Sequence, residues 1–206
     1  MILNDIEIKK LIKEPKAFNK KPLIENFNEE NLEGATYDVT INSTIHSFKK
    51  ETATIDLKEN RPYERAYNEE KLGEEGYVLA PNEYILVSIN ETLNLPDDVV
   101  CEVLPKTKLI RAGLILSSQY CNPSYFGKLQ LGLHNSSPNS VKIYSNLKIG
   151  QFIFKRLTSI PENLYRNKKT ASYQDEREFR GAKFTEEDIV KGEELLNKLR
   201  KSLGDS

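Results

Sequence analysis

Residues 103–154 constrain the fold of this chain more than any other stretch. Their apolar runs are short and are broken at regular intervals by Pro, Asn, Ser and Gly, a spacing typical of all-β domains. Within them, Leu129, Leu131 and Leu133 alternate with polar or small residues. Because the side chains of a strand point alternately to opposite faces, this pattern predicts one face in the core and one face in water.

The segments on either side predict further strands and a helix at each end. Asn4, with Glu7 three positions later, predicts a capped N-terminal helix that ends before Pro15. Residues 34–42 alternate as a strand, in which Asp38 is either a solvated acid or a turn acceptor. Residues 77–104 predict further strands separated by turns. Near the C-terminus, apolar residues at helical spacing predict an amphipathic helix, packed on its own domain or on a neighbouring subunit.

The length of 206 residues fits one domain with appendages. We expect a β domain over residues 1–182, with residues 165–182 forming an arm, followed by the C-terminal helix over residues 183–206. Residues 49–76 are charged and rich in turn formers, which predicts an irregular excursion or a hairpin rather than core.

Composition excludes several classes of partner. Thirty basic and 31 acidic side chains give a net charge of -1, which predicts no general attraction to nucleic acid or to an anionic membrane. No apolar run approaches the roughly 20 residues of a membrane span, and no signal-peptide pattern follows Met1, so we expect a cytoplasmic protein. Cys101 and Cys121 show no metal-ligand spacing and predict reduced thiols. With two histidines in the chain, we expect no zinc site.

Several segments follow one another in a specific order: MILNDIEIKKLI at the start, GATYDV at 34–39, the long hairpin GYVLAPNEYILVSINETLNLPDD at 76–98, KTKLIRAGL at 106–114, NPSYFGKLQLGLHN at 122–135 and LKIGQFIF at 147–154. Together they resemble the family of dCTP deaminases and trimeric dUTPases, and the N-terminal helix, the long hairpin and the arm favour the deaminase branch. The resemblance implies a mainly β fold, a distorted jelly roll or β-barrel with N-terminal and C-terminal helices. It also implies a homotrimer with sites between subunits, and a deoxynucleoside triphosphate bound with Mg²⁺.

The same resemblance implies a set of site residues. Arg111 falls on the arginine that the deaminases place beside the reacting water. Lys106 and Thr107 replace an Arg and a Ser that bind phosphate oxygens, which keeps a charge and a hydroxyl but loses the bidentate guanidinium. The alternative is that this basic cluster binds no phosphate and is simply solvated surface. The nucleotide-binding positions implied are Lys106, Thr107, Lys108, Asn122, Gln151, Tyr165, Lys168 and Gln174.

The chain departs from the family pattern at the positions that move protons. The deaminases use a Glu on the strand after the glycine motif, and here that position is Gly132. The dUTPases use an Asp where this chain has Asn122, which cannot act as a base. His134, two residues after Gly132 on the same strand face, is either a substitute acid–base group or a surface or interface histidine. Glu176 replaces a glutamine of the arm, and its charge would repel a triphosphate unless Mg²⁺ intervenes.

Three hypotheses follow. The chain is a Mg²⁺-dependent dCTP deaminase that forms dUTP or dUMP. Alternatively, it is a non-catalytic relative that binds a nucleotide or a protein partner as a regulatory or structural subunit. The third hypothesis is an altered substrate, admitted by a pocket that Gly132 widens.

Overall fold

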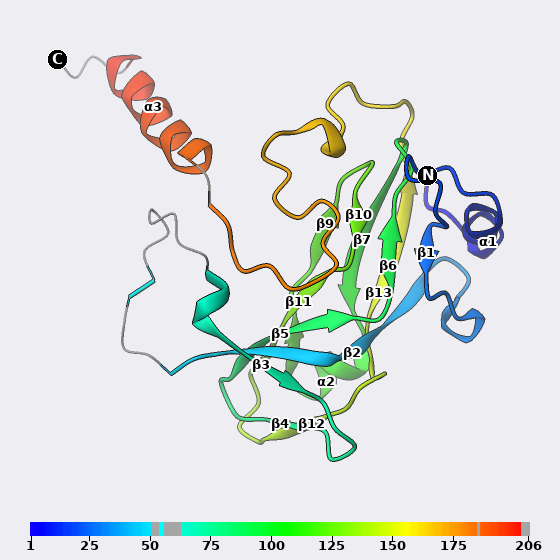
Figure 1. Cartoon of the computed structure of the whole chain (residues 1–206), viewed down its shortest axis with the longest axis vertical. Helices are drawn as coiled ribbons and strands as arrows, with labels where there is room; N and C mark the ends of the chain where they lie inside the picture. The colour runs from blue at the N-terminus through cyan, green and yellow to red at the C-terminus, as the bar shows by residue number, and fades with distance from the viewer. Residues whose placement is uncertain (51–53, 56–62, 185, 203–206) are drawn as a thin grey trace.

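The computed structural model describes residues 1–50, 54–55, 63–184 and 186–202. Within these ranges the strands form three antiparallel sheets, of eight, three and two strands. The largest sheet curls into a half-barrel around the core (Figure 1). This architecture confirms the mainly β, jelly-roll prediction.

The large sheet runs in the order β8-β11-β5-β2-β13-β7-β9, with β3 paired to β2. Its strands are β2 (Tyr37–Phe48), β3 (Tyr67–Lys71), β5 (Tyr84–Ile89), β7 (Val99–Pro105), β8 (Leu114–Leu116), β9 (Gln119–Cys121), β11 (Gln130–Asn135) and β13 (Lys148–Arg156). Strand β3 lies inside the charged segment that was predicted to be an irregular excursion or a hairpin, and its antiparallel pairing with β2 agrees with the hairpin for residues 67–71. Residues 51–53 and 56–62 of that segment lie outside the described ranges.

Two small sheets complete the β structure. The three-stranded sheet has the order β1-β6-β10, and the two-stranded sheet pairs β12 with β4. The bounds are β1 (Ile24–Glu25), β4 (Tyr77–Leu79), β6 (Thr92–Asn94), β10 (Phe126–Gly127) and β12 (Val141–Ile143), with 3-10 turns η1 (Glu29–Asn31), η2 (Tyr63–Ala66) and η3 (Tyr165–Asn167).

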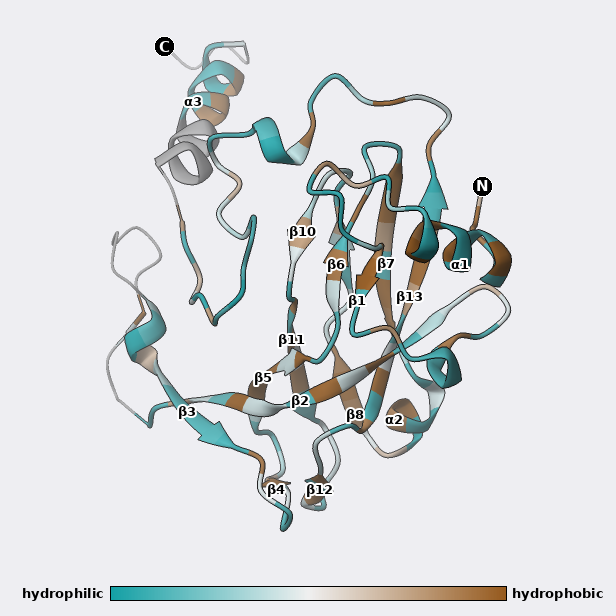
Figure 2. Cartoon of the chain, turned by 45° about the vertical axis from the view of Figure 1, so that its right-hand side comes forward, coloured by the Kyte–Doolittle hydropathy of each residue, from teal (hydrophilic) through white to brown (hydrophobic). Residues whose placement is uncertain are grey.

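The core follows the predicted alternation. Leu131 and Leu133 are fully buried, as are Val39 and Ile41 on β2, and Figure 2 shows hydrophobic residues recurring along these central strands. The prediction of a solvated Asp38 is wrong, because its side chain is 2% exposed. Its position on β2 lies between two paired strands, where water has little access.

The helices occupy the periphery. Helix α1 (Asp5–Lys13) begins with the predicted capping box, in which Asn4 accepts from the Glu7 N–H and the Glu7 carboxylate accepts from the Asn4 N–H. Helix α2 (Thr107–Arg111) is a short turn between β7 and β8. Among the described residues, no helix combines the length and apolarity needed to span a membrane.

The C-terminal helix α3 (Glu186–Ser202) confirms the predicted element and stands apart from the sheet in Figure 1. Leu195, Leu196 and Leu199 are between 51% and 62% exposed. The described leucines therefore do not pack on their own domain, so the interpretation left open is packing on a neighbouring subunit. Thr185 and Leu203 of the predicted helix lie outside the described residues.

Candidate functional site

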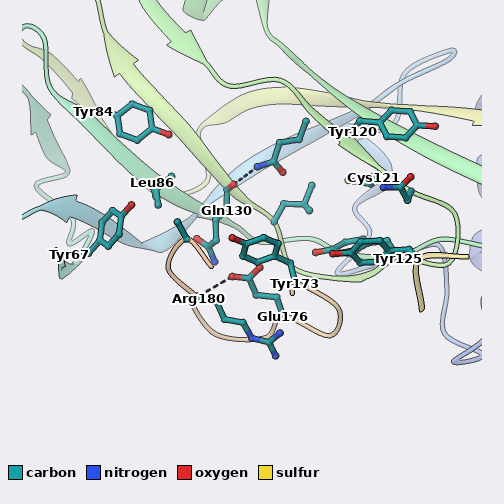
Figure 3. Close-up of a pocket in the computed structure, with 15 residues that line it drawn as sticks. Tyr67, Tyr84, Leu86, Tyr120, Cys121, Tyr125, Gln130, Tyr173, Glu176 and Arg180 are labelled. Carbon is teal, nitrogen blue, oxygen red and sulfur yellow. Dashed lines mark hydrogen bonds between the residues drawn. The ribbon is translucent and has the colours of Figure 1, made fainter. Parts of the chain in front are cut away.

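A cavity of about 490 Å³ lies between the outer face of the large sheet and the arm, residues 165–182 (Figure 3). Its volume falls in the range of small-molecule sites. Six of its lining residues are tyrosines, and amides, a carboxyl and a guanidinium complete the wall. The residues that line it are Tyr67, Tyr84, Leu86, Gln119, Tyr120, Cys121, Asn122, Tyr125, Leu129, Gln130, Tyr165, Tyr173, Glu176, Arg180 and Ala182.

Two glutamines hold fixed orientations in this cavity. The Gln119 side-chain N–H donates to the Gln130 backbone carbonyl over 2.7 Å, which turns the Gln119 carbonyl oxygen away from that bond. Ser88 donates its hydroxyl to Oε1 of Gln130 over 2.7 Å. Within the described structure, neither Oε1 of Gln119 nor Nε2 of Gln130 has a hydrogen-bond partner. The cavity therefore offers a ligand one oriented acceptor and one oriented donor.

The arm is held to the sheet by backbone and side-chain bonds. Lys128 donates its N–H to the Glu176 carbonyl over 2.8 Å, so the arm extends the β10 edge. Gln174 donates its side-chain N–H to the Ser124 carbonyl over 3.0 Å. Further along, the Phe179 ring stacks on His46 with 3.8 Å between ring centroids. The arm is thus a docked wall of the cavity.

Glu176 is an acid buried in this wall. Its side chain is 3% exposed, and its Oε1 accepts from the Arg180 backbone N–H over 3.0 Å. The Arg180 guanidinium instead donates to the backbone carbonyls of Ser172, Gln174 and Asp175. Burial raises the pKa of the Glu176 carboxyl to about 7, and the Arg180 N–H offsets this only in part.

Tyr84 occupies the space beside Gly132. A Cβ placed on Gly132 would lie 2.1 Å from the Tyr84 hydroxyl oxygen, so the phenol stands where a side chain at position 132 would begin. The hypothesis of a pocket widened at Gly132 is therefore wrong, because the tyrosine fills that volume. His134 pairs with Tyr84 on β5 and with Ile115 on β8, and it is half-buried outside the cavity lining.

A second cluster of predicted residues surrounds Asp38. Lys106 lies 2.5 Å from Oδ1 of Asp38, and Lys148 lies 3.3 Å from Oδ2. Gln151 is the cross-strand partner of Asp38 between β13 and β2. Two cations therefore compensate the buried Asp38 charge.

The predicted site residues fall into two separate groups in one chain. Asn122 and Tyr165 line the cavity, and Gln174 ties the arm to its rim. The second group consists of Lys106, Gln151 and the exposed α2 residues Thr107, Lys108 and Arg111. Figures 1 and 2 place α2 near the lower end of the sheet and β10 toward the upper end. Lys168 is exposed just after η3, outside both groups.

Sequence reasoning did not identify the two glutamines or Tyr84, and it treated Glu176 as a repulsive substitution. The strand alternation places Gln130 on the polar face, so that signal was present. No local pattern distinguishes Tyr84 from the other nine tyrosines. Its role follows from the β5–β11 register, which sets Tyr84 directly opposite His134.

A family model described as "dCTP deaminase-like" matches residues 2–157. A dUMP-forming dCTP deaminase from Tropheryma whipplei (strain Twist) is 31% identical over 182 residues, covering 86% of this chain and 89% of that protein. One from Nanoarchaeum equitans is 28% identical over 191 residues, covering 85% and 93%. This chain belongs to the dCTP deaminase-like family.

Among solved structures, a 2'-deoxycytidine 5'-triphosphate deaminase from Agrobacterium tumefaciens shares the fold, with a TM-score of 0.59 and 18% identity. The match covers 75% of this chain and 48% of that one, so this chain spans about half the length of that protein.

Proposed function

We propose that this chain is a dCTP deaminase-type hydrolase that converts dCTP to dUTP or dUMP, with the cavity beneath the arm holding the cytosine base. Its place in the dCTP deaminase-like family supports this proposal. The observation that carries it is the pair of oriented glutamines among six tyrosines in one cavity.

The polar groups of the cavity complement the edge of cytosine. Cytosine presents an amino donor at C4 beside acceptors at N3 and O2. The oxygen of Gln119 can accept from that amino group, and Nε2 of Gln130 can donate to a ring acceptor. Tyrosine faces stack on a base whatever its identity, so the rings supply affinity and the amides supply the choice of base.

The deamination itself requires proton transfer at three atoms. Water must lose a proton as it attacks C4, and N3 and then the leaving amine must gain one. Gly132 has no side chain to do this and Asn122 has no basic group, so another residue of the cavity must serve.

We further propose a homotrimer. In it, the phosphate-binding residues of one chain, which are Lys106, Gln151 and the exposed residues of α2, lie beside the cavity of a neighbouring chain. The separation of the two residue groups within one chain supports this arrangement. So do two exposed apolar side chains beside α2. Ile110 and Ile115 line one shallow pocket and are 57% and 56% exposed.

We propose, as the resemblance implies, that Mg²⁺ arrives with the nucleotide triphosphate, whose oxygens are hard ligands. Among the described residues, no group of three or more His, Cys, Asp or Glu side chains is placed to hold a metal ion.

The test of function is a product assay with purified protein, Mg²⁺ and each common deoxynucleoside triphosphate, resolved by chromatography. We expect ammonia and a uracil nucleotide from dCTP. The second candidate function is nucleotide binding without turnover, which the Tyr84 ring beside Gly132 favours. Saturable thermal stabilisation by dCTP with no product would establish that alternative.

The trimer is tested by light scattering on the wild type and on Ile115→Lys. We expect a wild-type mass of three times the 23.6 kDa chain, and dissociation in the variant, because a buried unpaired lysine is costly. Val78→Lys is the matched control, since Val78 is 55% exposed on the separate two-stranded sheet. A monomeric wild type would contradict the proposal.

A further inference from the structure

We propose that Glu176 of the arm is the general acid–base group of this chain, in place of the strand glutamate that Gly132 lacks. This inference rests on the proposed deaminase function. It assigns the proton transfers to a residue on a different element, the arm, which reaches the cavity from the side opposite β11.

The position of Glu176 satisfies the first requirement, access to the ligand. Its side chain lines the same cavity as Gln130 and Tyr173, and Figure 3 shows these three side chains directed into one space. Backbone bonds hold it there, because the Glu176 carbonyl accepts from Lys128 and the preceding Asp175 N–H donates to the Phe126 carbonyl, each over 2.8 Å. The carboxyl is therefore fixed relative to Gln130, which we expect to bind the base.

The surroundings of Glu176 satisfy the second requirement, easy exchange of a proton. Within the described structure, the one hydrogen-bond donor to its carboxylate is the Arg180 N–H, on Oε1. No ammonium or guanidinium is bonded to it, since the Arg180 guanidinium donates to three backbone carbonyls. Burial raises the pKa of the carboxyl to about 7, although the Arg180 N–H and the charge of the nearby Arg180 guanidinium oppose the shift, so the acid and base forms are both populated near neutral pH.

The proposed step balances as follows. The Glu176 carboxylate takes a proton from water as the water oxygen bonds to C4, and the resulting acid passes that proton to N3. The carboxylate then takes the proton of the new C4 hydroxyl and gives it to the amino group. The C4–N bond breaks, C4=O forms and ammonia leaves, so water and cytosine become uracil and ammonia with Glu176 regenerated.

Other titratable groups near Gly132 are less suited. His134 lies outside the cavity lining. Burial raises the pKa of the Tyr84 phenol above its ordinary range, which makes that hydroxyl a poor base at neutral pH. Of these three groups, Glu176 is the one that lines the cavity and has both protonation states accessible near neutral pH.

The test replaces Glu176→Gln, which keeps the size of the side chain and an acceptor for the Arg180 N–H. We expect kcat for dCTP to fall by about 10²- to 10⁴-fold, the usual contribution of a positioned acid–base group. Binding of dCTP, measured by calorimetry, should persist. In the wild type, the plot of kcat against pH should bend near pH 7. This bend should be absent from the residual activity of the variant. Glu178→Gln is the matched control, because Glu178 is an exposed arm acid outside this cavity, and its rate and profile should be unchanged.

Three results would overturn the inference. The first is an active wild type whose Gln variant keeps its rate and pH profile, which leaves the deaminase function standing. The second is loss of dCTP binding together with turnover in the Gln variant, which would make Glu176 a residue that shapes the arm. The third is a wild type that turns over no nucleotide, which ends the proposed function and this inference with it.

Discussion

Two carboxylates are almost equally buried in this protein, and their surroundings differ completely. Asp38 is 2% exposed and Glu176 is 3% exposed. Asp38 faces Lys106 and Lys148 at 2.5 and 3.3 Å, whereas Glu176 receives a single backbone N–H. A buried charge with two cationic partners is a fixed part of the structure. A buried carboxyl that is not bonded to a cationic side chain exchanges its proton readily. Charge compensation, rather than burial, therefore separates a structural acid from a reactive one.

The largest loss of stability should come from removing a cation that compensates the charge of Asp38. We expect Lys106→Met to lower the free energy of unfolding by about 3 kcal/mol, because a buried carboxylate loses its nearest cation. Denaturant titration without nucleotide measures this. Glu176→Gln provides the contrast and should leave stability nearly unchanged, since no ion pair is lost. Equal losses in the two variants would erase the distinction between these acids.

A smaller effect concerns the space that Tyr84 fills. Gly132→Glu should lower stability by about 1–3 kcal/mol, because the new Cβ meets the Tyr84 hydroxyl and the ring must turn away. The same variant carrying Tyr84→Ala should recover most of this loss, as seen in thermal melting. If the single variant is as stable as the wild type, the ring does not hold this space.

The smallest effect is the pH dependence of arm docking. Burial raises the pKa of Glu176 from 4.5 to about 7, so its stabilising contribution is present below pH 4.5 and is lost as the pH rises to about 7. His46 lies beneath Phe179, and burial lowers its pKa from 6.5, although Glu69 opposes the shift. Docking therefore also weakens below pH 6.5, where the released histidine takes a proton.

We expect hydrogen-exchange protection factors of the arm amides to fall between pH 6.5 and about pH 7, where the loss of the Glu176 contribution is unopposed, and to change less just below pH 6.5, where the two groups act in opposite directions. Glu176→Gln should remove the loss above pH 6.5, and His46→Gln should let protection rise further as the pH falls below 6.5. Protection that does not change between pH 5 and pH 8 in the wild type would show that neither group couples to docking.

The fold was predictable because its signals are local. The Asn4 and Glu7 capping box, the alternation of Leu129, Leu131 and Leu133, and the order of the motif segments are all visible in the sequence. Hydrophobic periodicity reports which face of an element is buried, whatever that face packs against.

The sequence by itself thus determined the family, the β architecture and the loss of a side chain at Gly132. The tertiary structure decided which acid we propose in its place. Residue 176 follows Gly132 by 44 positions, and the arm brings it to the cavity that Gln130 of β11 also lines, through bonds to residues 126–128 at β10 of the small three-stranded sheet. The pairing of Asp38 with Lys106 and Lys148 is equally remote in sequence. Burial and charge compensation depend on such long-range contacts, and these are set by the packing of the whole chain rather than by any local pattern.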